Sequence, residues 1–253
     1  MTTIGLLHPG EMGSAIGRAL RSRGETVLWA SAGRSAETAQ RAQHAGLEDA
    51  GAVGELVRRC EILLSVCPPH AAVEVAEAAA GFVGIYVDAN AIAPATARRI
   101  AGLHGRFVDG GIVGPPPDEP GTTRLYLSGA EAGAAAALFT DTAVEAAVIS
   151  EEPGAASALK AAYAGWTKGS AALLLAMREL AAAEGVEEPL RAEWRRSLPA
   201  LEERLAGAER SARHKGWRWI GEMEEISLAM SGQELPGGFH EAAAEVFRRW
   251  SVQ

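Results

Sequence analysis

The pattern of apolar and polar positions changes its character near residue 152. Before that point, short apolar runs alternate with stretches in which apolar residues have helical spacing. This alternation predicts βαβ units around a parallel sheet. An alanine-rich helix at 130–139 separates the last two expected strands, and 114–121 is expected to be a stiff, proline-rich loop. The expected strands are 4–7, 26–30, 62–66, 85–88, 106–108, 124–128 and 143–149.

Beyond Pro153-Gly154 the pattern is helical. Residues 155–184 contain no proline and much alanine and leucine, which predicts one long helix ending near Gly185. Further helices are expected at 189–196, 199–213, 217–230 and 239–250. The chain is therefore predicted to be α/β, with a Rossmann-type, doubly wound, mostly parallel sheet in residues 1–152 and an all-α domain in residues 153–253.

Composition excludes several classes of protein. The 253 residues carry a net charge of −8, and the basic residues are dispersed among carboxylates, so we expect no nucleic-acid partner. No apolar run is long enough to span a membrane and no signal peptide is apparent, so we expect a cytoplasmic protein. Cys60 and Cys67 are expected to be reduced core residues. The histidines form no cluster with metal spacing, and we expect no metal.

The loop between the first strand and the helix at 14–20 has the sequence H-P-G-E-M-G. In the G-x-G-x-x-G fingerprint of dinucleotide-binding proteins, the glycines make a tight turn, admit the pyrophosphate and allow the helix to pack on the strand. Gly10 and Gly13 keep the last two roles, while His8 replaces the first glycine. The loop, formed by His8, Pro9, Gly10, Glu11, Met12 and Gly13, is predicted to bind a pyrophosphate with the free amides of the helix.

The stretch after the second strand indicates which dinucleotide is bound. An NAD-binding protein usually has an acidic residue near this point for the ribose 2'-hydroxyl, and W-A-S-A-G-R-S has none. Ser31, Arg34 and Ser35 instead offer hydroxyls and a guanidinium that suit a 2'-phosphate, which favours NADP. Alternatively, Arg34 caps a surface loop and the serines cap the next helix.

Two further strand ends are expected beside the nicotinamide half of the cofactor. Cys67, Pro68 and Pro69 follow the strand at 62–66. Asn90 follows the strand at 85–88, where its side chain can bind the ribose or the carboxamide and take part in catalysis. Its alternative role is that of a turn-forming asparagine.

Five stretches together resemble the β-hydroxyacid dehydrogenase superfamily, which includes 6-phosphogluconate dehydrogenases, 3-hydroxyisobutyrate dehydrogenases, glyoxylate reductases and imine reductases. The chain is most similar to a short branch whose carboxyl-terminal helical domain has no generally assigned function. The stretches are G-E-M-G-S-A-I-G-R-A-L, S-V-C-P-P, V-D-A-N-A-I-A-P, F-V-D-G-G-I-V-G-P-P-P and G-A-A-S-A-L-K-A-A-Y-A-G-W-T-K-G.

The resemblance implies a catalytic lysine on the long helix, which is Lys160 here. It also implies a substrate pocket formed in part by Gly111, Val113 and Gly114, where the family has D-x-P-V-S-G-G. The family's asparagine four residues after the lysine is Ala164. Other expected substrate residues on this helix are Tyr163, alternatively a packing residue, and Thr167.

The residues support the same chemistry independently. Lys160, Lys168 and Lys215 are the three lysines among 24 basic residues. Burial and the charge of an oxidised nicotinamide can lower the pKa of a lysine, which arginine does not allow. Lys168 is a second catalytic candidate, with a structural ion pair as its alternative.

We therefore expect an NADPH-dependent reductase of a small carbonyl or imine compound, with Lys160 as the proton donor. The alternatives are an imine reductase specifically, or a non-catalytic NADP-binding or sensing protein. The resemblance further implies a homodimer formed through the helical domain.

Overall fold

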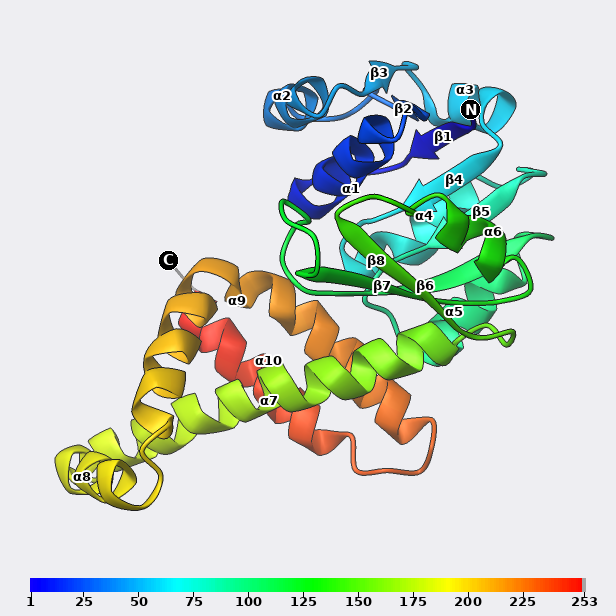
Figure 1. Ribbon diagram of the computed structural model, residues 1–253. Coiled ribbons are helices and arrows are strands. Elements are labelled where there is room, and N and C mark those ends of the chain that lie inside the picture. The colour runs from blue at the N-terminus through cyan, green and yellow to red at the C-terminus, as the bar shows by residue number, and fades with distance from the viewer. Residues whose placement is uncertain (252–253) are drawn as a thin grey trace. The chain divides into compact units, whose positions relative to one another are not determined.

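The computed structural model describes residues 1–251. The chain divides into two compact units, Met1–Lys160 and a second that begins at Ala161. The long helix α7 (Ala155–Ala183) starts in the first unit and continues into the second (Figure 1). Each unit is described by itself.

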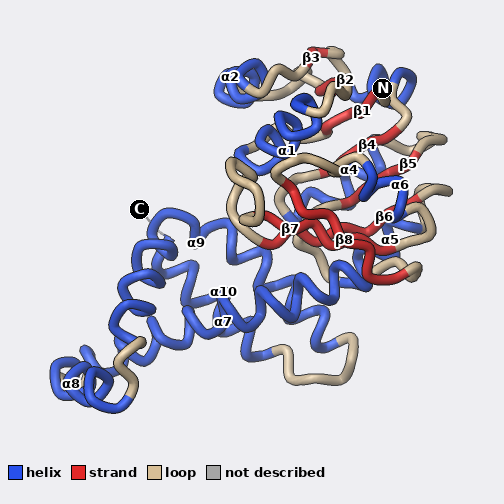
Figure 2. Tube along the Cα trace, in the orientation of Figure 1, coloured by secondary structure: helices blue, strands red, loops and turns tan. Residues whose placement is uncertain are grey.

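Residues 1–160 contain an eight-stranded sheet in the order β3-β2-β1-β4-β5-β6-β7-β8. Neighbouring strands are parallel except β6 and β7, which are antiparallel. The strands of this sheet are red in Figure 2. The order reverses beside β1, as in doubly wound nucleotide-binding folds. The strands are β1 (Thr3–Leu6), β2 (Thr26–Trp29), β3 (Glu48–Asp49), β4 (Ile62–Ser65), β5 (Ile85–Asp88), β6 (Phe107–Val113), β7 (Thr123–Ser128) and β8 (Val144–Ser150).

Both faces of this sheet are covered by helices, because successive side chains of a strand point to opposite faces. On β4, Ile62 and Leu64 join one apolar cluster and Leu63 joins the other. The first cluster includes residues of α1 (Glu11–Ser22), α2 (Ala36–His44) and α6 (Ala132–Ala137), and the second includes residues of α3 (Val53–Arg59), α4 (Ala72–Ala78) and α5 (Pro94–Ala101). The predicted α/β class, with a doubly wound and mostly parallel sheet, is confirmed.

Two strands differ from the prediction. β3 has two residues, which is too short for any hydrophobic pattern to reveal. β6 continues to Val113, five residues past the expected end, because Asp109, Gly110 and Gly111 interrupt the apolar run without interrupting the strand. This extension lets β6 pair with β7 along its second half.

Asp109, in the middle of β6, binds the beginning of α7. Its fully buried carboxylate accepts hydrogen bonds from the amides of Gly154 (3.0 Å) and Ser157 (2.9 Å) and from the hydroxyls of Ser157 (2.5 Å) and Ser128 (3.0 Å). The free amides and positive dipole end of a helix favour such a carboxylate. The first turn of α7 is thereby fixed to β6 and β7.

The second unit is helical, with a core of apolar residues from all its helices. It comprises the rest of α7, α8 (Glu187–Ser197), α9 (Leu201–Ser231) and α10 (Gly238–Ser251), and α10 packs along α9. None of the helices in the described part of the chain is sufficiently long and apolar to cross a membrane.

The expectation of two helices at 199–213 and 217–230 is wrong, because α9 runs through both. Gly216, between them, is buried within the helix. A Cβ atom at this position would lie 3.4 Å from the Cβ of Ser251 and 3.6 Å from the carbonyl oxygen of Phe247. Such a Cβ atom would make ordinary van der Waals contacts, so Gly216 lies where α9 packs on α10 and does not end a helix.

Replacing Asp109 by alanine is expected to lower the free energy of unfolding by about 2–4 kcal/mol, because four buried donors lose their acceptor. Asp118→Ala is the matched control. Asp118 pairs with Arg18 at the surface, so its loss should cost less than about 1 kcal/mol. Urea unfolding of both variants measures the difference. Equal stabilities would show that the Asp109 contacts do not hold the helix.

Candidate cofactor and active site

The loop after β1 has the shape required for a phosphate-binding turn. A Cβ atom on Gly13 would lie 2.2 Å from the carbonyl oxygen of His8, so only glycine fits there. A Cβ atom on Gly10 would meet nothing within 4 Å, so this side of the loop is open. The amides at the beginning of α1 follow directly. The loop thus combines close internal packing at Gly13 with an open approach at Gly10.

The packing of α1 on the sheet depends on Gly17, which the sequence reasoning had left out. A Cβ atom there would lie 2.8 Å from Leu47 Cδ2 and 3.3 Å from Leu6 Cδ2. Gly13 and Gly17 therefore both allow α1 to pack closely, a role that the sequence analysis assigns to Gly13 alone. A glycine one helical turn after the fingerprint was the available signal.

His8 is a partly buried, neutral residue of the loop. Burial and, secondarily, the charge of Arg34 lower the pKa of His8 from 6.5 to about 4. Its Nδ1 atom is buried and has no hydrogen-bond partner among the described residues. At neutral pH His8 can offer a hydrogen bond to a ligand but no positive charge.

Two arginines lie against the same loop. Arg34 donates a hydrogen bond from Nη2 to the carbonyl oxygen of Leu7 (3.4 Å), and Arg41 of α2 donates from Nε to that of Pro9 (3.5 Å). Arg41 also donates to the hydroxyl of Thr38 (3.1 Å). Sequence reasoning identified Arg34 and missed Arg41. The i, i+3 spacing of Thr38 and Arg41 on the helix that follows Arg34 was the signal for it.

The two serines of this region have protein partners. Ser35 caps α2 by accepting a hydrogen bond from the amide of Thr38 (3.3 Å). Ser31 hydrogen-bonds with Asp49. Asp49 lies on β3, where it pairs with Trp29 at the end of β2. An acidic residue therefore does lie beside β2. The sequence reasoning found none because Asp49 comes from another strand.

Two buried atoms in this region lack partners within residues 1–251, Nε of Arg34 and Nδ1 of His8. Buried polar groups are normally satisfied, so such atoms point to a ligand. Together with the open side of Gly10 and the amides of α1, they fit the phosphate groups of a dinucleotide.

Asn90 is buried just after β5, and its side chain hydrogen-bonds to residues at the end of β4. Its Oδ1 atom accepts a hydrogen bond from the amide of Cys67 (2.5 Å), and its Nδ2 atom donates to Ser65 (3.0 Å) and Asp88 (2.9 Å). A direct role of Asn90 stays a prediction, since these contacts use both amide hydrogens.

Burial raises the pKa of the Cys67 thiol to about 12, so Cys67 is not a nucleophile at neutral pH. Pro68 and Pro69 lead into a short 3₁₀ helix (Pro69–Ala71).

Lys160 lies on α7 where this helix crosses β6. A Cβ atom on Gly111 would lie 2.7 Å from the carbonyl oxygen of Ala156 and 3.0 Å from the Cβ atom of Lys160. Gly111 is therefore the position at which β6 admits the helix. Within residues 1–251, the Lys160 ammonium group has no hydrogen-bond or ion-pair partner.

The other expected substrate residues are distributed along β6 and α7. Val113 is buried, and Gly114 has a φ of +122° in the turn that follows β6. On α7, Ala164 is buried in the helical core, while Tyr163 and Thr167 are exposed. Their contact with a substrate stays a prediction.

Lys168 forms an ion pair with Glu222 and lies 5.4 Å from the centre of the Trp219 ring. This contact is the structural ion pair that 'Sequence analysis' gives as the alternative role of Lys168. Among the described residues, no group of three or more histidine, cysteine, aspartate or glutamate side chains is arranged to hold a metal ion.

Comparisons with known proteins agree with this arrangement. An uncharacterised 28.5 kDa protein encoded in the 7S RNA 5' region of Methanothermus fervidus is 30% identical over 190 residues, which are 74% of each chain. The solved structure of the conserved protein MTH1747, whose function is unknown, is 28% identical. It has a TM-score of 0.74, covers 98% of this chain and 96% of its own, and is described as similar to 3-hydroxyacid dehydrogenases. The chain belongs to the β-hydroxyacid dehydrogenase-like superfamily.

Two further comparisons concern the helical domain and the fold. Residues 181–250 match the family described as a domain of unknown function, DUF1932, which corresponds to the helical domain and identifies the short branch. A reductive aminase from Aspergillus terreus, solved in complex with NADPH and ethyl-5-oxohexanoate, is 20% identical. It has a TM-score of 0.60 and covers 98% of this chain and 93% of its own, and so shares the fold.

Proposed function

We propose that this β-hydroxyacid dehydrogenase-like protein is an NADPH-dependent oxidoreductase that reduces a small carbonyl or imine compound. The observation that carries the proposal is the pair of unpartnered buried atoms, Arg34 Nε and His8 Nδ1, beside the open face of Gly10. The NADPH bound by the reductive aminase of the same fold supports the choice of cofactor.

In this proposal the loop and the first helix bind the cofactor phosphates. The amides at the beginning of α1 bind the pyrophosphate, and Gly10 leaves room for it. Arg34 and Arg41 bind the 2'-phosphate, since two guanidinium groups outweigh the single carboxylate of Asp49. The Asp49 carboxylate already accepts the amide of Gly51 (2.8 Å) and contacts Ser31.

Lys160 is the proton donor. A bound reduced nicotinamide supplies the hydride that reduces the substrate carbon. The Lys160 ammonium group gives a proton to the carbonyl oxygen as negative charge develops on it, so that a carbonyl becomes an alcohol. Gly111 and the Asp109 contacts hold the backbone of this lysine against β6.

We further propose that two copies pair through their helical domains. Leu228, Leu235 and Phe239 are 60%, 55% and 74% exposed, which is unusual for large apolar side chains and suits a subunit interface. Sedimentation equilibrium should give twice the chain mass for the wild type and a weakened dimer for Phe239→Ser. A wild-type monomer at micromolar concentration would contradict this proposal.

Arg34→Leu and Arg41→Leu are each expected to weaken NADPH binding about 10- to 100-fold, because a charged hydrogen bond to phosphate is lost. NADH binding should change little. Calorimetric titration of both cofactors measures this, with the exposed Arg59→Leu on α3 as the control. Tighter binding of NADH by the wild type would assign the ribose site to Asp49 instead.

Lys160→Met is expected to lower kcat about 100-fold or more without changing the Kd of NADPH, since general acid catalysis is lost. The measurement is NADPH oxidation with ketoacids, aldehydes and cyclic imines, using the exposed Lys215→Met as the control. Equal turnover by Lys160→Met would remove this lysine from the mechanism. Binding of NADPH without turnover across the panel would favour a sensing protein.

A further inference from the structure

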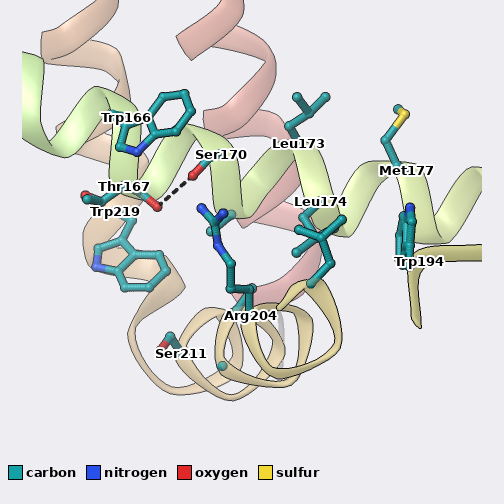
Figure 3. A pocket seen from close by; sticks show the side chains of 14 residues that line it. Trp166, Thr167, Ser170, Leu173, Leu174, Met177, Trp194, Arg204, Ser211 and Trp219 are labelled. Atoms are coloured by element: carbon teal, nitrogen blue, oxygen red, sulfur yellow. Dashed lines mark hydrogen bonds between the residues drawn. The ribbon is translucent and has the colours of Figure 1, made fainter. Parts of the chain in front are cut away.

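The helical unit contains a cavity of its own, with a volume of about 520 Å³. It lies between α7 and α9, and α8 closes one end with Trp194 (Figure 3). Every residue that lines it comes after residue 165, so the cavity belongs to the helical unit alone. A cavity of this size is typical of small-molecule sites.

The walls of the cavity are mostly apolar and rich in tryptophan. Trp166 and Trp219 stand at one side, Trp194 at the other, and Leu174 lies between them (Figure 3). Aromatic and aliphatic side chains of this kind bind the apolar body of a ligand. The hydroxyls of Ser170 and Ser211 are among the few polar groups in the lining.

Arg204 supplies the one guanidinium of the lining. It extends from α9 into the cavity, toward α7 (Figure 3). Among residues 1–251 its guanidinium has no ion pair or hydrogen bond. The other arginines of this region differ, since Arg178 pairs with Glu187 and Glu209, and Arg191 and Arg195 pair with Glu202. Arg204 is exposed, so its guanidinium is an unpaired cation at the open side of an apolar cavity.

Gly207 keeps the cavity open beside Arg204. It lies within α9, where glycine is less favourable than alanine. A Cβ atom there would meet nothing within 4 Å, so packing does not require the glycine. Glycine at this position lowers the stability of the helix and leaves open space in the cavity lining.

We propose that this cavity binds a small amphipathic carboxylate, with its apolar body against the tryptophans and its carboxylate on Arg204. A planar guanidinium fits a carboxylate with two parallel hydrogen bonds. A single cation matches a single negative charge, and the apolar walls favour an aryl or alkyl tail. The ligand is bound whether or not a dinucleotide is present.

The test uses 4-phenylbutanoate and dodecanoate as probes, with the corresponding alcohols as neutral partners. Binding to the full chain is followed by tryptophan fluorescence and calorimetry. Arg204→Leu should weaken binding of both carboxylates at least about tenfold and leave the alcohols unchanged. Arg210→Leu, an exposed arginine of the same helix outside the lining, is the matched control and should behave as the wild type.

Gly207→Leu fills the cavity and should weaken the acids and the alcohols alike, while thermal unfolding confirms that the variant is folded. The Kd of NADPH should stay the same in every variant, which separates this site from the cofactor site. The proposal is overturned if neither carboxylate binds, or if Arg204→Leu binds them as the wild type does. It is also overturned if Trp166→Ser turns a wild-type dimer into a monomer, because a second copy would then cover this face.

Discussion

The attachment of α7 to the sheet through the Asp109 carboxylate is the interaction on which the proposed active site depends. Four donors from β7, the turn before α7 and the first turn of that helix meet at one buried side chain of β6. Two residues further along the same strand, Gly111 leaves room for Ala156 and Lys160. Asp109 fixes where the helix begins, and Gly111 fixes how closely it lies on the strand. Lys160 follows Ser157 by three residues, so its position on the sheet is set by these two contacts rather than by any partner of its ammonium group.

The neighbouring buried carboxylate, Asp88, accepts hydrogen bonds from the amide and the side chain of Asn90. Asp88 and Asp109 are register partners on β5 and β6, and both are fully buried. Burial raises the pKa of Asp88 to about 7, the hydrogen bonds from Asn90 oppose this, and the Asp109 charge raises it further. Asp88 can therefore carry a proton near neutral pH. Asn90 connects Asp88 to Ser65 and to the amide of Cys67, so the ends of β4 and β5 share one polar network. This network positions the loop that begins at Cys67.

The parts predicted from the sequence are those that a single local pattern determines. Alternating periodicity predicted the doubly wound sheet, and the loop glycines predicted the tight turn after β1, because each depends on residues close together in the chain. Asp49 and Arg41 were missed for the opposite reason. Asp49 reaches Ser31 because a two-residue strand pairs with β2, and Arg41 reaches Pro9 from within α2. The break expected between 213 and 217 was wrong because Gly216 packs against α10 inside one continuous helix, a contact that appears only in the folded chain. Periodicity describes an element, whereas these contacts join separate elements.

The same limit applies to Arg204, whose place in the sequence gives no sign of a special role. The helical domain carries many arginines, and a helix rich in arginine and glutamate usually presents a solvated, paired surface. Three arginines near the cavity follow that rule. Arg204 departs from it, because α9 directs its guanidinium toward α7 (Figure 3) and none of the described carboxylates pairs with it. The guanidinium of Arg204 stays in contact with solvent, because the residue is exposed, and can therefore pair with the anionic group of a ligand. Gly207 lowers helix stability in the same lining. The proposed ligand uses both positions, since its carboxylate pairs with Arg204 and its apolar body needs the space beside Gly207.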